Sequence, residues 1–191
     1  HVSGCVFLEE APAEAARHAI DIACEAGIPV SIDPAAYSFI HAQGRQAFLK
    51  LCEGATVILP NLDEGRAMTG LEQPEDIASC LLDHFPVVAL KLGADGCLGM
   101  ARQWAGMAGS TGAAGSIGAG AEAAAGAGAA GRADGADAGG HALEKGLVAA
   151  VRFAAVPTRV VDTTGAGDAF DAGFVLEYSR GAGLAAGLAR A

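Results

Sequence analysis

The chain has 191 residues, a formal net charge of −10 and a sequence pI of about 4.8. This acidic balance, without a basic stripe, disfavours nucleic-acid binding, and no apolar run approaches the roughly 20 residues of a membrane span. The five cysteines are scattered without zinc or disulfide spacing, so we expect free thiols and a cytoplasmic protein.

Short apolar runs alternate with helical periodicity along most of the chain. In chain order the pattern predicts a strand at 2–8, a helix at 12–26, a strand at 28–32, a helix at 37–52 weakened by Gly44, a strand at 56–59, helices at 63–69 and 74–85, a strand at 86–92 with 96–101 able to pair with it, a strand at 147–155, a helix at 169–178 and the start of another at 183–191. This alternation predicts a largely parallel sheet with helices on both faces.

Polar residues and glycines follow several of the expected strands. Asp33, Asn61, Gly93 and Asp162 each lie just past a strand-like run, the last of which ends at Val160-Val161. Ligands of such sheets bind beyond the carboxyl ends of the strands. We therefore expect these four residues to gather at one edge.

Residues 105–140 differ from the rest of the chain, because 27 of these 36 residues are Ala or Gly. Such a segment cannot bury enough apolar surface to offset its chain entropy. We expect a disordered surface insertion that separates residues 1–104 from 141–191 of one α/β domain. A lid, or an artefact of sequencing or translation, is the alternative.

Nine residues near the C-terminus combine two acids with a glycine turn: Asp162-Thr163-Thr164-Gly165-Ala166-Gly167-Asp168-Ala169-Phe170. A glycine-rich turn that opens a helix directs backbone N–H groups and partial positive charge at one spot. That pattern is typical of an anion site, most often for phosphate. Asp168 at its rim is suited to accept a proton or to meet a metal ion.

The nonapeptide closely resembles the signature of the ribokinase (PfkB) family of carbohydrate kinases, Asp-Thr-x-Gly-Ala-Gly-Asp-x-Phe. The resemblance implies a ribokinase-like, three-layer α/β/α fold with a mostly parallel sheet, here incomplete. It also implies transfer of the ATP γ-phosphoryl group to a sugar hydroxyl. In that reaction Asp168 would be the general base, and the backbone of Gly165, Ala166, Gly167 and Asp168 would form the anion hole.

Two further segments resemble elements of the same family. Asn61 and Glu64 match its Asn-x-x-Glu element, which implies that they hold Mg²⁺ through water, although a helix cap explains them equally. Residues 91–97 resemble its strand and glycine turn beside the nucleotide. Lys91, Gly93 and Gly96 would then contact ATP, with a solvated lysine and a tight hairpin turn as the alternatives.

Asp162 and Thr164 resemble positions near a K⁺ site in the family, and Thr164 would also lie near the nucleotide.

Two positions depart from the family. Asp33 lacks the Asn and Arg that often follow it, so we expect it to satisfy a strand end or to cap a helix rather than to bind phosphate or substrate. Asp171 stands where relatives commonly carry Asn. It shares a helix face with Asp168 and would either raise the pKa of Asp168 or, as we expect, point away and pair locally.

The resemblance covers nearly all of the chain outside the insertion, but it begins well inside the family's fold. We therefore expect a fragment that lacks much of the acceptor site, and a homodimer only in the full-length protein. An inactive nucleotide-binding remnant, or a kinase for a nucleoside or vitamin alcohol, are the alternative functions.

Overall fold

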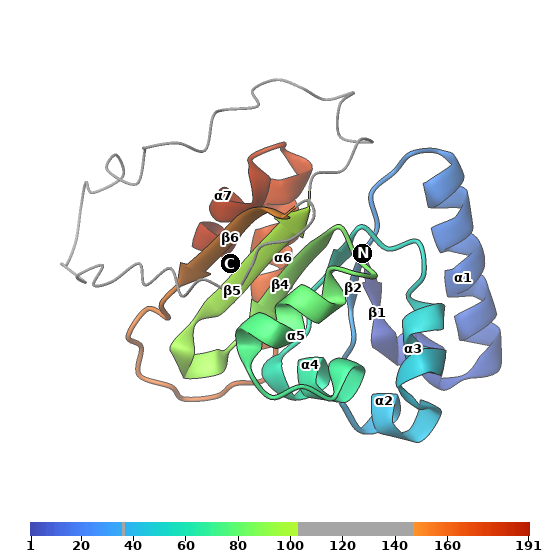
Figure 1. Cartoon of the computed structure of the whole chain (residues 1–191), viewed down its shortest axis with the longest axis horizontal. Coiled ribbons are helices and arrows are strands. Elements are labelled where there is room, and N and C mark those ends of the chain that lie inside the picture. Colours follow the sequence, from blue (N-terminus) through green and yellow to red (C-terminus); the bar gives the residue numbers. More distant parts are fainter. Residues whose placement is uncertain (36, 103–146) are drawn as a thin grey trace.

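The computed structural model describes residues 1–35, 37–102 and 147–191 (Figure 1). The expected insertion at 105–140 lies outside these described residues. None of the described helices combines the length and apolar character that crossing a membrane requires.

A six-stranded sheet runs through the described part of the chain, with its strands in sequence order (Figure 1). The strands are β1 Val2–Ser3, β2 Ser31–Asp33, β3 Val57–Ile58, β4 Val87–Lys91, β5 Cys97–Arg102 and β6 Leu147–Phe153. β1 to β4 pair in parallel, whereas β5 pairs antiparallel with both β4 and β6. The expected mostly parallel sheet, including the pairing of the strand at 86–92 with the one after it, is confirmed.

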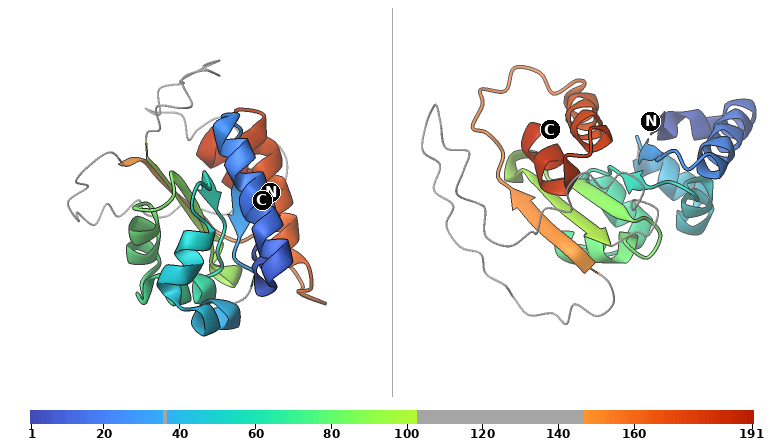
Figure 2. Two further views of the ribbon diagram at one scale, coloured as in Figure 1. Left: turned by 90° about the vertical axis from the view of Figure 1, so that its right-hand side faces the viewer. Right: turned by 90° about the horizontal axis from the view of Figure 1, so that it is seen from above.

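Helices cover both faces of the sheet, which confirms the three-layer arrangement (Figure 2). One face carries α2 Tyr37–Gln43, α3 Arg45–Leu51, α4 Leu62–Thr69 and α5 Pro74–Leu81; the other carries α6 Ala166–Ser179 and α7 Gly183–Arg190. The helix α1 Glu10–Glu25 packs beside the 3₁₀ helix η1 Gly4–Leu8, and a second 3₁₀ helix, η2 Gly93–Asp95, joins β4 to β5.

Two apolar cores follow from the alternation of side chains along the strands. Ile58, Val88 and Leu90 point to the α2–α5 face, whereas Val57 and Val87 point to the face covered by α6 and α7. All five are at most 3% exposed. Strands buried on both faces read as continuous apolar runs, which is why the sequence located them well.

The N-terminal part shows three differences from the sequence predictions. The strand at 2–8 ends at Ser3, where the chain turns into η1; Gly4 lies so close to Pro34 that a Cβ there would clash with the Pro34 carbonyl. Ile28 is 58% exposed and still belongs to the turn that ends α1, since its N–H bonds to Ala23, so β2 begins only at Ser31. Gly44, at φ 84°, divides the helix expected at 37–52 into α2 and α3.

The strand-like run at Val160-Val161 is not a strand. Both valines are exposed, at 69% and 89%, in an irregular segment at 154–165. β6 ends at Phe153, opposite Cys97, and α6 begins at the same edge of the sheet. The connection therefore starts and ends at one edge and does not cross the sheet. Asp162 consequently does not follow a strand, contrary to the prediction.

Candidate active site

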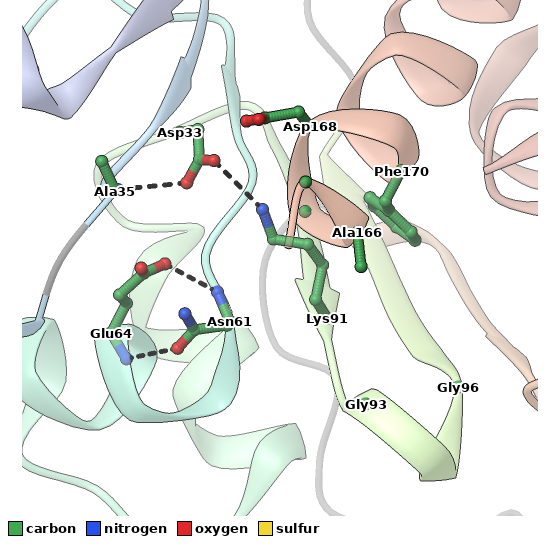
Figure 3. A pocket seen from close by; sticks show the side chains of 12 residues that line it. Asp33, Ala35, Asn61, Glu64, Lys91, Gly93, Gly96, Ala166, Asp168 and Phe170 are labelled. Atoms are coloured by element: carbon green, nitrogen blue, oxygen red, sulfur yellow. Dashed lines mark hydrogen bonds and ion pairs between the residues drawn. The ribbon is translucent and has the colours of Figure 1, made fainter. Parts of the chain in front are cut away.

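A cavity of about 460 Å³ opens at the carboxyl ends of β2, β3 and β4 (Figure 3). Its walls come from the ends of these strands, from the β4–β5 turn and from the first turn of α6. It is lined by Asp33, Ala35, Asn61, Glu64, Lys91, Gly93, Gly96, Gly165, Ala166, Gly167, Asp168 and Phe170. The structure thus brings Asp33, Asn61 and Gly93 to one edge of the sheet, as the strand ends suggest.

The N-terminus of α4 forms one wall of the cavity and caps itself. The Asn61 side chain accepts a hydrogen bond from the Glu64 N–H at 2.9 Å, and Glu64 Oε2 accepts one from the Asn61 N–H at 2.9 Å (Figure 3). This is a capping box, so the helix-cap alternative describes their local role. Burial raises the pKa of Glu64, which is 3% exposed, while its bond to Asn61 lowers it.

Lys91 ends β4 in the lining of the cavity, and its ammonium group forms ion pairs with two carboxylates. Its Nζ lies 3.1 Å from Asp171 Oδ1 and 3.4 Å from Asp33 Oδ2, and 6.0 Å from the centre of the Phe170 ring. Figure 3 shows Lys91 pointing from its strand toward Asp33. The solvated-lysine alternative does not hold, because the side chain is only 12% exposed.

Asp171 is the buried acid of α6, with 3% of its surface exposed. Burial raises its pKa to about 7; Lys91 opposes this rise and the nearby Asp33 adds to it. Its Oδ2 is buried without a hydrogen-bond partner among the described residues. The expected local pairing of Asp171 is therefore wrong, because its partner is Lys91, which lies 80 positions away in the chain.

The N-terminus of α6 forms the opposite wall. Gly165 precedes the helix in the left-handed conformation, at φ 75°, and provides no side-chain cap. The Ala166 N–H donates to the Thr163 carbonyl at 3.1 Å, and the Ala169 N–H donates to the Gly165 carbonyl at 2.9 Å. Gly167 and Asp168 lie between them, in the turn where helical N–H groups lack an intrahelical acceptor. The exposed side chain of Asp168 borders the cavity (Figure 3).

Two expected site residues, Asp162 and Thr164, lie outside the cavity lining. Asp162 Oδ1 accepts a hydrogen bond from the Thr164 N–H at 2.8 Å, which lowers the pKa of this exposed carboxyl. The pair thus shapes the turn before α6. The described residues include no group of three or more His, Cys, Asp or Glu side chains arranged to hold a metal ion.

Sequence reasoning missed part of the lining. Phe170 belongs to the nonapeptide and was assigned no role, whereas its ring faces the cavity beside Lys91. Ala35 takes a positive φ of 71°, and its N–H bonds to Asp33 Oδ1 at 3.1 Å. Asp33 thus fills its expected strand-end role and also pairs with Lys91. The position of Asp33 directly after a predicted strand was the sequence feature that placed it at the site.

The family model for pfkB family carbohydrate kinases matches residues 1–130 and 133–191. This match covers nearly the whole chain, and the chain therefore belongs to that family. No curated protein sequence matches it.

Several solved structures share the fold. A PfkB protein from Polaromonas sp. JS666 is 23% identical, with a TM-score of 0.65 over 98% of this chain and 48% of that one. Aminoimidazole riboside kinase from Salmonella enterica, solved with aminoimidazole riboside and an ATP analogue, is 21% identical, with a TM-score of 0.63 over 94% and 46%. Fructokinase from Vibrio cholerae O395, solved with fructose, ADP and calcium, is 18% identical, with a TM-score of 0.61 over 94% and 45%. The chain spans less than half the length of each.

Proposed function

We propose that this chain carries the phosphoryl-transfer site of a kinase that moves the γ-phosphoryl group of ATP to a hydroxyl of a sugar or sugar-like acceptor. One observation carries the proposal. The open N-terminus of α6, the carboxylate of Asp168 and the capped wall at Asn61 and Glu64 border a single cavity. Membership of the family and the ligands named for the two kinases above support it.

Asp168 is the proposed general base. Its carboxylate is exposed at the cavity rim, where an acceptor hydroxyl can reach it. A general base of this kind typically contributes about 10²–10⁴-fold to the rate.

The first turn of α6 is the proposed anion hole. The N–H groups of Gly167 and Asp168 stabilise charge on the phosphoryl oxygens, because they point out of the helix end together with its dipole. Ala166 contributes less than its position suggests, since its N–H already donates to Thr163. Gly93 and Gly96, both at positive φ, form the turn beside the nucleotide.

Asn61 and Glu64 fit a hydrated Mg²⁺ at the opposite wall. Glu64 Oε2 accepts the hydrogen bond of the capping box, and this bond holds the carboxylate in place. The Glu64 side chain lines the cavity, and its second oxygen is not used in the capping box. Mg²⁺ commonly keeps most of its waters and uses one or two carboxylates. Bound there, it would neutralise phosphate charge next to the acidic lining.

Asp168→Asn tests the function in the 191-residue chain. We expect a loss of turnover of about 10²–10⁴-fold with ATP affinity changed less than about threefold, because the amide cannot accept the proton. Glu177→Gln, on the same helix and paired with Arg180, is the matched control. Unchanged turnover in Asp168→Asn would remove the assignment of the base.

A panel of sugars, nucleosides and vitamin alcohols identifies the acceptor class. Transfer to a sugar supports the proposal as stated, and transfer only to a nucleoside or vitamin changes the acceptor. ATP binding without transfer to any of them would leave a nucleotide-binding chain and reject the kinase function for this chain.

A further inference from the structure

Three charged side chains from three different elements meet at the cavity: Asp33 and Lys91 line it, and Asp171 pairs with Lys91. Asp33 ends β2, Lys91 ends β4 and Asp171 lies in α6, and their side chains are only 13%, 12% and 3% exposed. We call these three residues the charged cluster. It joins α6 to the ends of β2 and β4 through polar contacts.

The register of α6 links the charged cluster to the proposed base. Asp171 follows Asp168 by three residues, which is slightly less than one helical turn. The two residues buried in α6 are Asp171 and Phe174, so they mark its sheet-facing side. A position fixed at Asp171 therefore fixes the height and the rotation of the turn that carries Gly167 and Asp168.

The first turn also approaches Lys91 directly. A Cβ on Gly167 would lie 3.7 Å from Lys91 Nζ, so the backbone at this point lies close above the ammonium group. Lys91 thus lies near α6 at two successive turns: it pairs with the carboxylate of Asp171, and the backbone at Gly167 passes near its ammonium group. This arrangement leaves the helix start little freedom to tilt relative to β4.

Buried charges suit a positioning role better than a stabilising one. Burying an ion pair costs desolvation that cancels much of its attraction, while its geometry stays demanding. In the charged cluster Asp171 uses only Oδ1, and its Oδ2 has no partner among the described residues. An apolar side chain could pack α6 on the sheet without this cost, but it would not fix a directional contact.

We propose that Asp171 is a positioning residue that acts through Lys91 and Asp33 to set where the first turn of α6 presents Asp168 and its N–H groups. The proposal rests on the proposed function for its catalytic consequence. Its structural part, that the charged cluster controls the first turn locally, is independent of which acceptor is used.

The variants Asp171→Ala and Asp171→Asn test the proposal. Alanine removes the contact with Lys91, whereas the asparagine Oδ1 can still accept from Lys91 and its amide can donate toward Asp33. Glu177→Ala, which removes the acid of an exposed ion pair on the same helix, is the matched control.

Amide hydrogen exchange provides the readout that does not depend on activity. The Ala169 amide, bonded to the Gly165 carbonyl, reports on the first turn, and the Leu59 amide, bonded to the Ile32 carbonyl, reports on the sheet. In Asp171→Ala we expect Ala169 to exchange at least about 10-fold faster relative to Leu59. In Asp171→Asn and Glu177→Ala the ratio should match the parent.

Turnover provides the second readout. We expect kcat of Asp171→Ala to fall about 10–100-fold, because small misplacements of catalytic groups are costly, and Asp171→Asn to stay within about threefold of the parent. If the parent transfers no phosphoryl group, the proposed function fails, and the exchange ratio alone decides the positioning role. An exchange ratio in Asp171→Ala equal to the parent's overturns the proposal, as does an equal acceleration at Leu59.

Discussion

Two helix N-termini face the same cavity, and they satisfy their backbone groups in opposite ways. At α4 the side chains of Asn61 and Glu64 bond to the backbone of the first turn in a reciprocal capping box. At α6 the cap position is Gly165, which has no side chain to offer. The first helix end is closed by its own residues, and the second is left open toward the cavity.

The two helix starts also differ in the residues that hold them in place. At the start of α4, residues 61 and 64 hold each other through their side chains, in addition to the backbone bridge between Asn61 and Lys91. α6 is held through Asp171 by Lys91, which lies 80 positions earlier in the chain. An N-terminus that is to receive a ligand cannot cap itself, so its position must be set from outside the turn.

Among the predictions, removal of the Lys91 ammonium group should cause the largest loss of unfolding free energy. Lys91→Met leaves Asp33 and Asp171 without their cation, and breaking a buried pair in this way costs about 3–5 kcal/mol of unfolding free energy. Urea unfolding at pH 8 measures it, with Lys50→Met in the exposed part of α3 as the control. A loss below about 1 kcal/mol would show that Lys91 does not hold α6.

The protonation of Asp171 should make the unfolding free energy depend on pH. The folded protein raises the pKa of Asp171 to about 7 by burial, so the folded state binds this proton more tightly than the unfolded chain does. Between about pH 4 and pH 7 this group therefore lowers the unfolding free energy as pH rises, by at most about 1.4 kcal/mol per pH unit.

Asp171→Asn removes this contribution, since an amide does not titrate. The difference in unfolding free energy between variant and parent should grow from about pH 4 to pH 7 and then level off. Denaturant unfolding in steps of half a pH unit measures it. A constant difference across this range would contradict a raised pKa at Asp171.

Giving α6 a cap of its own should make it resemble α4. In Gly165→Asp the added carboxylate would lie at the open N–H groups and repel phosphate, so we expect ATP affinity to fall about 10–100-fold, or about 1.4–2.8 kcal/mol. Calorimetric titration measures this change. Gly165→Asn, which tolerates a positive φ without adding charge, is the control. Equal affinities of parent and Gly165→Asp would indicate that phosphate does not bind this turn.

Opening the α4 cap should have the smallest effect. Asn61→Ala removes the acceptor for the Glu64 N–H, and loss of such a cap costs about 1 kcal/mol. Asn61→Asp, which keeps an acceptor oxygen, should recover most of the loss in thermal unfolding. If Asn61→Ala unfolds like the parent, the capping box does not stabilise α4.

Local signals in the sequence predicted much of the fold. The buried strands stand out because both of their faces are apolar, whereas Gly44 only weakened the single helix predicted at 37–52, which the structure divides into α2 and α3. Val160-Val161 misled the prediction, because two apolar residues cannot show whether a neighbouring strand is available. Gly4, at which η1 replaces the predicted N-terminal strand, lies close to Pro34, which is 30 positions away and outside the local pattern.

The site divides in the same manner. The nonapeptide and the Asn61–Glu64 spacing identified both walls of the cavity, since each wall is formed by residues close in sequence. The charged cluster was not predicted as a unit, because its members lie on three elements. The sequence predicted only that Asp171 shares a helix face with Asp168. That placement does not identify Lys91 as its partner.

The walls of the cavity come from positions as far apart as Asp33 and Phe170, joined only through the sheet. No short piece of the chain contains the site, so a ligand that binds here recognises the folded state alone. Nucleotide binding is therefore linked to the folding equilibrium of the whole sheet. ATP at about 100 times its dissociation constant would raise the unfolding free energy by about 2.7 kcal/mol, and a shift in the unfolding temperature would report binding without any turnover.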